Sequence, residues 1–161
     1  MTNKYVYDDQ VQRKYILLVL RGYIIRNILI SFFISLYFII TAYTFSNIKY
    51  LAYLILVFVL DIVVFLKVKK AIKDGLNAFH EKHNGNNPTV TVEIKDKLII
   101  KSDGRERCMS YKSIARLIQD KKMIVAISYE GEGCLIMKAS FVEGDAKTCY
   151  SLIKKSMKLK K

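Results

Sequence analysis

The chain has 161 residues and carries 27 lysines and arginines against 14 aspartates and glutamates, a net charge of +13. A basic chain suits nucleic acid, anionic lipid or an acidic partner, but no basic helix here carries a recognisable nucleic-acid motif, so nucleic acid is not expected. The cysteines, Cys108, Cys134 and Cys149, are odd in number and include no C-x-x-C pair. This pattern argues against a disulfide framework and for a reducing compartment.

Residues 1–26 mix apolar and basic residues, and we expect them to form an interfacial segment that leads into a membrane. The aspartate pair Asp8-Asp9 can cap a helix that begins just after it. The basic residues of this helix can keep their stems in the headgroup layer. A longer, tilted membrane span that starts near Tyr15 is the alternative, but it would bury Arg21 in lipid.

Two apolar runs follow, over residues 27–48 and 50–66, with one lysine between them. Each run approaches the roughly 20 residues that cross the hydrocarbon core of a bilayer as a helix. Two spans joined by a few residues can only be an antiparallel helical hairpin, because lipid cannot satisfy unpaired backbone groups. We therefore expect a transmembrane hairpin over residues 27–66, with Ser46-Asn47 in its turn.

Basic residues lie at the same end of both predicted spans, whereas the connecting turn has a single lysine. The positive-inside rule places both termini in the cytoplasm and the turn outside. Residues 67–87 are expected to form a basic juxtamembrane helix and a linker that ends in the breaker NGNNP. The cations expected to contact anionic headgroups here are Arg21, Arg26, Lys67, Lys69, Lys70 and Lys73.

The region 88–161 has the pattern of a small cytoplasmic domain of short antiparallel strands. Strands are expected at TVTVEIK, KLIIKS, RERCMSY, MIVAISY and CLIMKASF, with turn signals between them. The segment KSIARLIQD is either a short helical turn or a strand. The pattern predicts an α+β fold, in which an antiparallel β-barrel or sandwich is capped by a C-terminal helix.

The capping helix is predicted over residues 144–158, where apolar residues recur at helical spacing. A lysine-rich tail overlaps its end and includes Lys154, Lys155 and Lys158. These lysines either form a solvated helix face or contact the headgroups of the nearby membrane surface, and the sequence favours neither interpretation over the other.

Three segments carry a resemblance to a known family: VTVEIKDKLIIKS, RCMSYKSIARLIQDKKMIVAISY and CLIMKASF. The last is similar to an "-IPK-x-x-F" segment, with Met137 in place of the usual proline, and Tyr111 stands where tryptophan is common. In these segments and in its order of elements, the chain resembles the YcxB-like family of small bacterial membrane proteins. The resemblance implies a bacterial inner-membrane protein with two membrane helices and a pleckstrin-homology-like cytoplasmic domain. It implies no defined biochemical role.

Asp61 is the one charged residue inside the second predicted span. A carboxylate at mid-depth costs about 2.5–3.5 kcal/mol on insertion scales, so such a residue is functional by default. Folding the hairpin about its turn brings Asp61 level with Ser31 and Ser35, and a hydrogen bond from either serine would hold the two helices together. Pairing with Arg26 is a variant of this structural role, and a proton or ion pathway is the alternative.

No motif in the chain indicates catalysis or a cofactor. His80 and His83 share a helix face, but no cysteine or carboxylate cluster completes a metal site. The Gly-Glu-Gly turn lacks the residues of a phosphate loop, and no serine lies in G-x-S-x-G. We therefore expect neither enzymatic activity nor a bound cofactor.

The expected function is that of a membrane-anchored binding or adaptor protein, whose β-domain recognises a protein segment or a lipid headgroup. Its expected partners are the anionic lipids of the inner leaflet, together with a protein partner or a second copy bound through the hairpin. A small transporter or channel component that uses Asp61 is the alternative.

Overall fold

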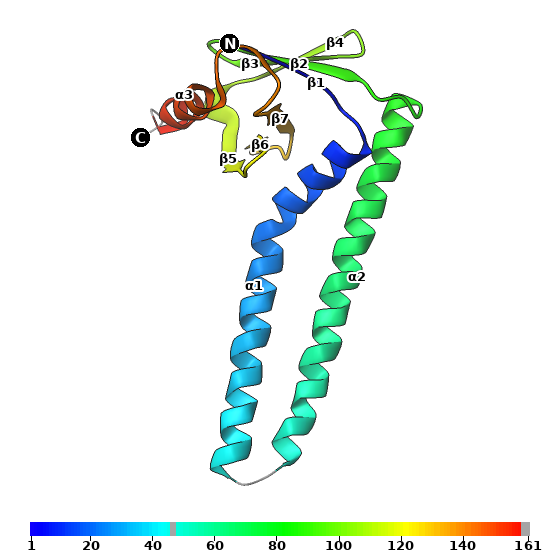
Figure 1. The fold of residues 1–161 in the computed structure, drawn as a ribbon, viewed down its shortest axis with the longest axis vertical. Coiled ribbons are helices and arrows are strands. Elements are labelled where there is room, and N and C mark those ends of the chain that lie inside the picture. The colour runs from blue at the N-terminus through cyan, green and yellow to red at the C-terminus, as the bar shows by residue number, and fades with distance from the viewer. Residues whose placement is uncertain (46–47, 159–161) are drawn as a thin grey trace.

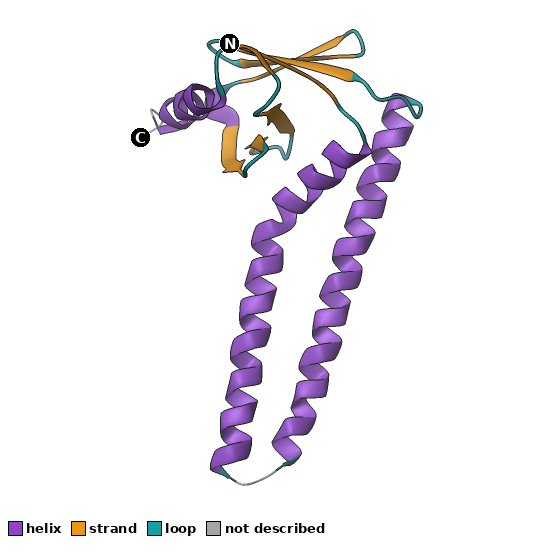
Figure 2. Cartoon of the chain, in the orientation of Figure 1, coloured by secondary structure: helices purple, strands orange, loops and turns teal. Residues whose placement is uncertain are grey.

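The computed structural model describes residues 1–45 and 48–158, except for the side chains of Leu51 and Lys158. Two long helices, α1 (Asp9–Thr44) and α2 (Lys49–His83), run antiparallel and project from one side of a β-rich domain (Figure 1). The short helix α3 (Ala146–Lys158) packs on that domain (Figure 2). The strands are β1 (Thr2–Val6), β2 (Thr89–Ile94), β3 (Leu98–Ser102), β4 (Arg105–Met109), β5 (Ile114–Gln119), β6 (Met123–Ser128), β7 (Gly133–Met137) and β8 (Phe141–Glu143).

Helix α1 begins where the sequence predicts it. The side chain of Asp8 accepts a hydrogen bond from the backbone N–H of Val11 at 2.8 Å, which satisfies one of the free donors of the first turn. The helix then continues without a break to Thr44, because no proline interrupts it. The predicted interfacial helix and the first predicted span are therefore parts of one helix.

Within the described residues, α1 is the one helix that is long and apolar enough to cross a membrane, and none of its apolar stretch is buried against the protein. The second predicted span, residues 50–66, falls in α2, whose described residues do not meet this criterion. Its apolar run contains Asp61 and leads directly into Lys67 and Lys69. The predicted turn residues Ser46-Asn47 lie outside the described residues.

Strand β1 is a finding that the sequence did not predict. It lies inside the larger sheet, whose order is β4-β3-β2-β1-β8, and it pairs antiparallel with β2 on one side and β8 on the other. The helical pair is therefore an insertion between two neighbouring strands. The prediction that residues 88–161 contain the whole β-domain is wrong, because Thr2–Val6 belongs to the same sheet.

The predicted barrel does not close in the described structure. The second sheet has three strands, in the order β5-β6-β7, and no strand pairing joins it to the first. Side chains join the two sheets instead, along a seam between β1 and β7. Asn3, which is fully buried, donates from Nδ2 to Met137 O at 2.7 Å and accepts from Met137 N at 3.1 Å. Tyr5 donates from its hydroxyl to Leu135 O at 2.9 Å.

These bonds satisfy the outer edge of β7 as a neighbouring strand would. Buried backbone groups need such partners, since an unpaired buried donor or acceptor costs about 1–3 kcal/mol. Arg107, on β4, extends the same seam by donating to Gly133 O at 3.0 Å. The two sheets are thus held by side-chain bonds where a barrel would use a ladder.

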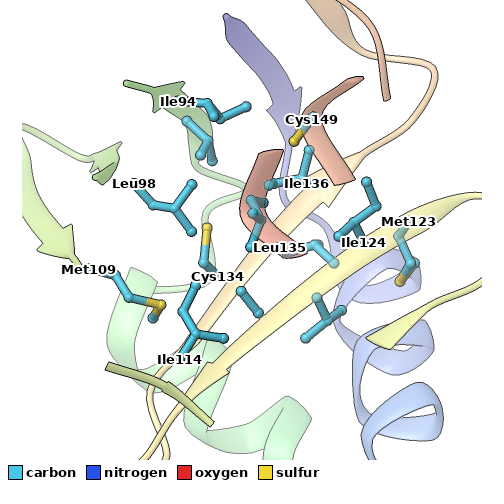
Figure 3. Packing of buried hydrophobic residues seen from close by; sticks show 14 of the residues in the cluster. Ile94, Leu98, Met109, Ile114, Met123, Ile124, Cys134, Leu135, Ile136 and Cys149 are labelled. Carbon is cyan, nitrogen blue, oxygen red and sulfur yellow. The ribbon is translucent and has the colours of Figure 1, made fainter. Parts of the chain in front are cut away.

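The hydrophobic core lies between the two sheets and is closed by helices (Figure 3). Cys149 and Ile153 bring α3 into this core, in agreement with the predicted amphipathic C-terminal helix. Val11 and Leu18 bring in the first part of α1. These two side chains pack on the β-domain, in a segment that the sequence predicted to be interfacial.

Most of the remaining strands lie where the alternation predicts them. For the segment KSIARLIQD, the sequence left a helical turn and a strand as alternatives, and the structure has both. A single 3₁₀ turn at Tyr111–Ser113 overlaps its start, and strand β5 follows. The predicted last strand is divided, with β7 ending at Met137 and β8 beginning at Phe141.

Two of the three cysteines belong to the core. Burial raises the pKa of Cys134 to about 12 and that of Cys149 to about 11, so both thiols stay protonated at neutral pH. Cys108, in contrast, is exposed on β4.

Candidate functional site

A belt of cations lies on the helical pair between its apolar part and the β-domain. All six of the helix cations predicted to meet headgroups are exposed. From Lys67 to His83, α2 runs another 16 residues, which is about 24 Å at 1.5 Å per residue. The end of α2 that adjoins β2 therefore lies well beyond the belt. The belt consists of Arg21, Arg26, Lys67, Lys69, Lys70 and Lys73.

The lysines of α3 lie apart from this belt. Lys154 and Lys155 are exposed, and Lys154 Nζ lies 5.7 Å from the centre of the Tyr150 ring. Figure 1 shows α3 near the level of the C-terminal end of α2, on the side of the molecule away from the hairpin tip. The side chain of Lys158 lies outside the described structure.

The two helices share a polar contact within their apolar stretches. Ser31 donates a hydrogen bond to Asp61 Oδ1 at 2.5 Å, which is the contact that the hairpin geometry led us to expect. Ser35 is one turn away and makes no hydrogen bond to Asp61 in the described structure. The guanidinium of Arg26 lies 6.0 Å from the centre of the Tyr23 ring and forms no described ion pair with Asp61.

A groove of about 500 Å³ runs beside this contact, between α1 and α2. Asp61 remains exposed at its wall, so one face of the carboxylate is available to another group. The groove is lined by Ile24, Asn27, Ile28, Ser31, Phe32, Ser35, Asp61, Val64, Phe65 and Val68.

Replacing Ser31 with alanine is expected to weaken the association of α1 and α2 by about 0.6–2 kcal/mol, the range measured for hydrogen bonds between membrane helices. Ser35→Ala is the matched control, because it removes the same hydroxyl from the same groove without breaking a bond to Asp61. Thermal unfolding of the purified protein in detergent measures both. Equal losses of stability in the two variants would assign no particular role to the Ser31 bond.

The helices and the β-domain meet at a second polar junction, centred on Tyr7. Its hydroxyl donates to Gln12 Oε1 at 2.5 Å, and Gln12 Nε2 donates to Gly75 O at 3.0 Å. The Tyr7 ring meets the Phe79 ring edge to face, with centroids 5.2 Å apart. Burial raises the pKa of Tyr7 well above its ordinary value, so the phenol remains a donor.

The two histidines of α2 bind separate carboxylates at this junction. His80 Nε2 lies 3.2 Å from Asp9 Oδ1, and His83 Nδ1 lies 2.6 Å from Asp103 Oδ2. No group of three or more metal-ligating side chains occurs in the part of the chain that the structure describes. Sequence reasoning missed these pairs because Asp9 and Asp103 are far from the histidines along the chain.

Close packing of the two helices at the junction depends on Gly75. A Cβ at this position would lie 2.5 Å from Ile16 Cδ1 on α1, whereas nothing lies within 4 Å of a Cβ at Gly22. We expect Gly75→Leu to separate the helices and to cost about 1–3 kcal/mol, as overpacking does elsewhere.

Gly22→Ala is the control for this prediction. It should stabilise α1 by up to about 1 kcal/mol, because alanine is the better helix former and the site is open. Both variants can be compared by thermal unfolding in the same detergent. A Gly75→Leu protein as stable as the unmodified chain would mean that Ile16 moves aside without cost.

No family model matches the chain, and it has no match among the curated proteins or the solved structures compared with it. The resemblance to the YcxB-like family therefore stays a prediction. What the site can do must be argued from its geometry alone.

Proposed function

We propose that this chain is a membrane-anchored binding protein, in which α1 and α2 cross the bilayer as a hairpin and hold the β-domain at the cytoplasmic face. Residues 27–48 and 50–66 are the two spans of this proposal. The β-domain recognises a protein segment or a lipid headgroup, and it has no catalytic role. The cell membrane of a bacterium, with both termini inside, is the proposed location.

The pairing of β1 with β2 carries this proposal. Val6 lies opposite Thr89, and Tyr7 N donates to Pro88 O at 2.8 Å, so the two ends of the helical insertion lie on the same side of any membrane. If α1 crosses the bilayer, the chain must cross it again before Pro88. Helix α2 is the segment available for the return.

The surface of α2 supports this assignment. Nine of its large apolar side chains are exposed over one continuous stretch, although a water-soluble helix would bury such residues. In the hydrocarbon core of a bilayer, the exposure of these apolar side chains carries no free-energy cost. The residues are Ile55, Leu56, Phe58, Val59, Leu60, Ile62, Val63, Phe65 and Leu66.

The belt of cations supports the orientation. Its six members lie on the β-domain side of the apolar stretches, where the positive-inside rule expects the cytoplasm. Each lysine or arginine near an anionic leaflet contributes about 1 kcal/mol of attraction. The belt thus fixes the depth of the hairpin as well as its direction.

A labelling experiment tests the topology. Ile48, at the tip of the hairpin, is 78% exposed, and Cys108 on β4 is also exposed. In a Cys108→Ser background, Ile48→Cys should react with a membrane-impermeant maleimide added to intact cells. In the unmodified chain, Cys108 should react only after the membrane is permeabilised. Reaction of Cys108 in intact cells would reverse the proposed orientation.

One observation favours a second candidate function, that of a small transport or channel component. The carboxylate of Asp61 borders the groove between the helices and keeps one face open to it. In reconstituted vesicles, this role requires a proton or ion flux that Asp61→Asn abolishes and Ser35→Ala leaves intact. A membrane-anchored binding protein has no such flux.

A further inference from the structure

We infer that the turn between β5 and β6 is a second membrane contact, and that it binds the anionic headgroups of the bilayer that the hairpin crosses. This inference rests on the proposed function, since it requires the hairpin to be embedded. It assigns a role to cations outside the belt on α1 and α2.

The turn gathers positive charge at one end of the three-stranded sheet. Lys121 and Lys122 are exposed within it, and the backbone N–H of Lys138 donates to Lys122 O at 2.9 Å, which places a third lysine beside them. None of these lysines takes part in the ion pairs described in the structure.

The one acidic residue of the turn is occupied by the backbone. Asp120 Oδ1 accepts hydrogen bonds from the N–H groups of Lys122 at 2.7 Å and Met123 at 2.8 Å. This arrangement shapes the turn and engages the carboxylate with amides, so the two lysine side chains project without an ion-pair partner.

The fold directs this turn toward the membrane. Figure 1 shows β5 running toward the hairpin side of the β-domain, so its end approaches the first part of α1. Helix α1 packs on the domain core as far as Leu18 and Val19, and its charge-free stretch begins eight residues later at Asn27. Eight residues of helix span about 12 Å.

Lysine side chains of the turn can reach across the distance between the packed part of α1 and its charge-free stretch. The headgroup region adds about 5–7 Å to each side of the hydrocarbon core. A lysine stem can extend over most of the remaining distance, with its ammonium group among the phosphates. Helix α3 lies farther from the hairpin tip than this turn (Figure 1), so its lysines are less well placed for the same contact.

Together with the hairpin, this contact would fix the tilt of the β-domain over the membrane. An ammonium near an anionic leaflet raises the ratio of docked to undocked states about fivefold. Neutralising both Lys121 and Lys122 should therefore lower that ratio about 25-fold.

Fluorescence quenching in reconstituted vesicles tests the inference on the full-length protein. A fluorophore on Ala139→Cys, in a Cys108→Ser background, reports from the exposed residue beside Lys138. Lipids that carry a quencher in the headgroup should quench it in vesicles rich in phosphatidylglycerol, but only weakly in pure phosphatidylcholine. The same fluorophore on native Cys108 should be quenched in neither, because its strand β4 lies at the end of the β-domain away from the hairpin tip (Figure 1).

Charge variants complete the experiment. The pair Lys121→Gln and Lys122→Gln should remove the quenching, whereas the matched pair Lys154→Gln and Lys155→Gln on α3 should leave it intact. Equal quenching in both lipids, or a loss with the α3 pair alone, would overturn the inference. Because labelling of Ile48→Cys tests the hairpin independently, a failure here with a correct hairpin would leave the proposed function standing.

Discussion

A fragment that spans residues 88–161 will not fold, although it contains seven of the eight strands described. Without Thr2–Val6, strands β2 and β8 each lose the neighbour that lies between them in the sheet. The buried side chains of Asn3 and Tyr5 are lost as well, and with them the bonds to the outer edge of β7. We expect the fragment to show no cooperative unfolding transition by circular dichroism.

Restoring β1 without the helices should restore the fold. Tyr7 N lies 2.8 Å from Pro88 O, so residues 1–7 can be joined to residues 88–161 by an Asn-Gly turn of the kind that closes two-residue hairpins. This chain should unfold cooperatively. It should be less stable than the full protein, because Val11 and Leu18 each contribute about 1.5–3 kcal/mol of buried apolar surface. A folded 88–161 fragment would show that β1 is dispensable.

Asn3→Leu is expected to have the largest effect of any single substitution considered. Leucine has a similar branched shape, but it leaves the N–H of Met137 without a partner. The C=O of Met137 loses the Asn3 amide and keeps the backbone N–H of Ser140, at 3.1 Å. An unpaired buried N–H costs about 1–3 kcal/mol, and the hydrogen bond lost at the C=O costs about 0.5–1.5 kcal/mol. The expected loss is therefore about 1.5–4.5 kcal/mol, out of the roughly 5–15 kcal/mol that stabilises a domain. For a domain of this size, Tm should fall by about 10–30 °C.

Lys4→Gln is the control, because Lys4 lies next to Asn3 on the exposed face of the same strand. Surface changes of this kind usually stay within about 0.5 kcal/mol. Scanning calorimetry of both proteins in one detergent gives the comparison. A small effect of Asn3→Leu would mean that the edge of β7 finds other partners.

The features that were predictable from the sequence have local causes. Alternation placed β2, β3, β4, β6 and β7, helical spacing placed α3, and the carboxylate of Asp8 marked the start of α1. The contact between Ser31 and Asp61 was also accessible, because a tight hairpin fixes which residues of its two helices are level. In each case, the signal and the structure it specifies lie within one element or one turn.

The features that were missed depend on residues far apart in the chain. Strand β1 is five residues long, and nothing near it indicates that its partner begins at Thr89. The seam that replaces a closed barrel depends on Asn3, an unremarkable polar residue until Met137 lies against it. The first part of α1 has a basic, amphipathic pattern that suits a membrane surface and a protein core equally well, and the sheet decided between them.

The position of β1 has a consequence for biosynthesis. Tyr5 pairs with Val90, so β1 leaves the ribosome before both helices and must wait for them before its partner exists. Contacts this distant form late, after the intervening chain has been ordered. In the proposed topology, a hairpin that inserts only halfway leaves β1 and β2 on opposite faces of the bilayer, and the sheet cannot form. Folding of the β-domain would then report on correct insertion, and a wrongly inserted chain would expose unpaired strands to proteolysis.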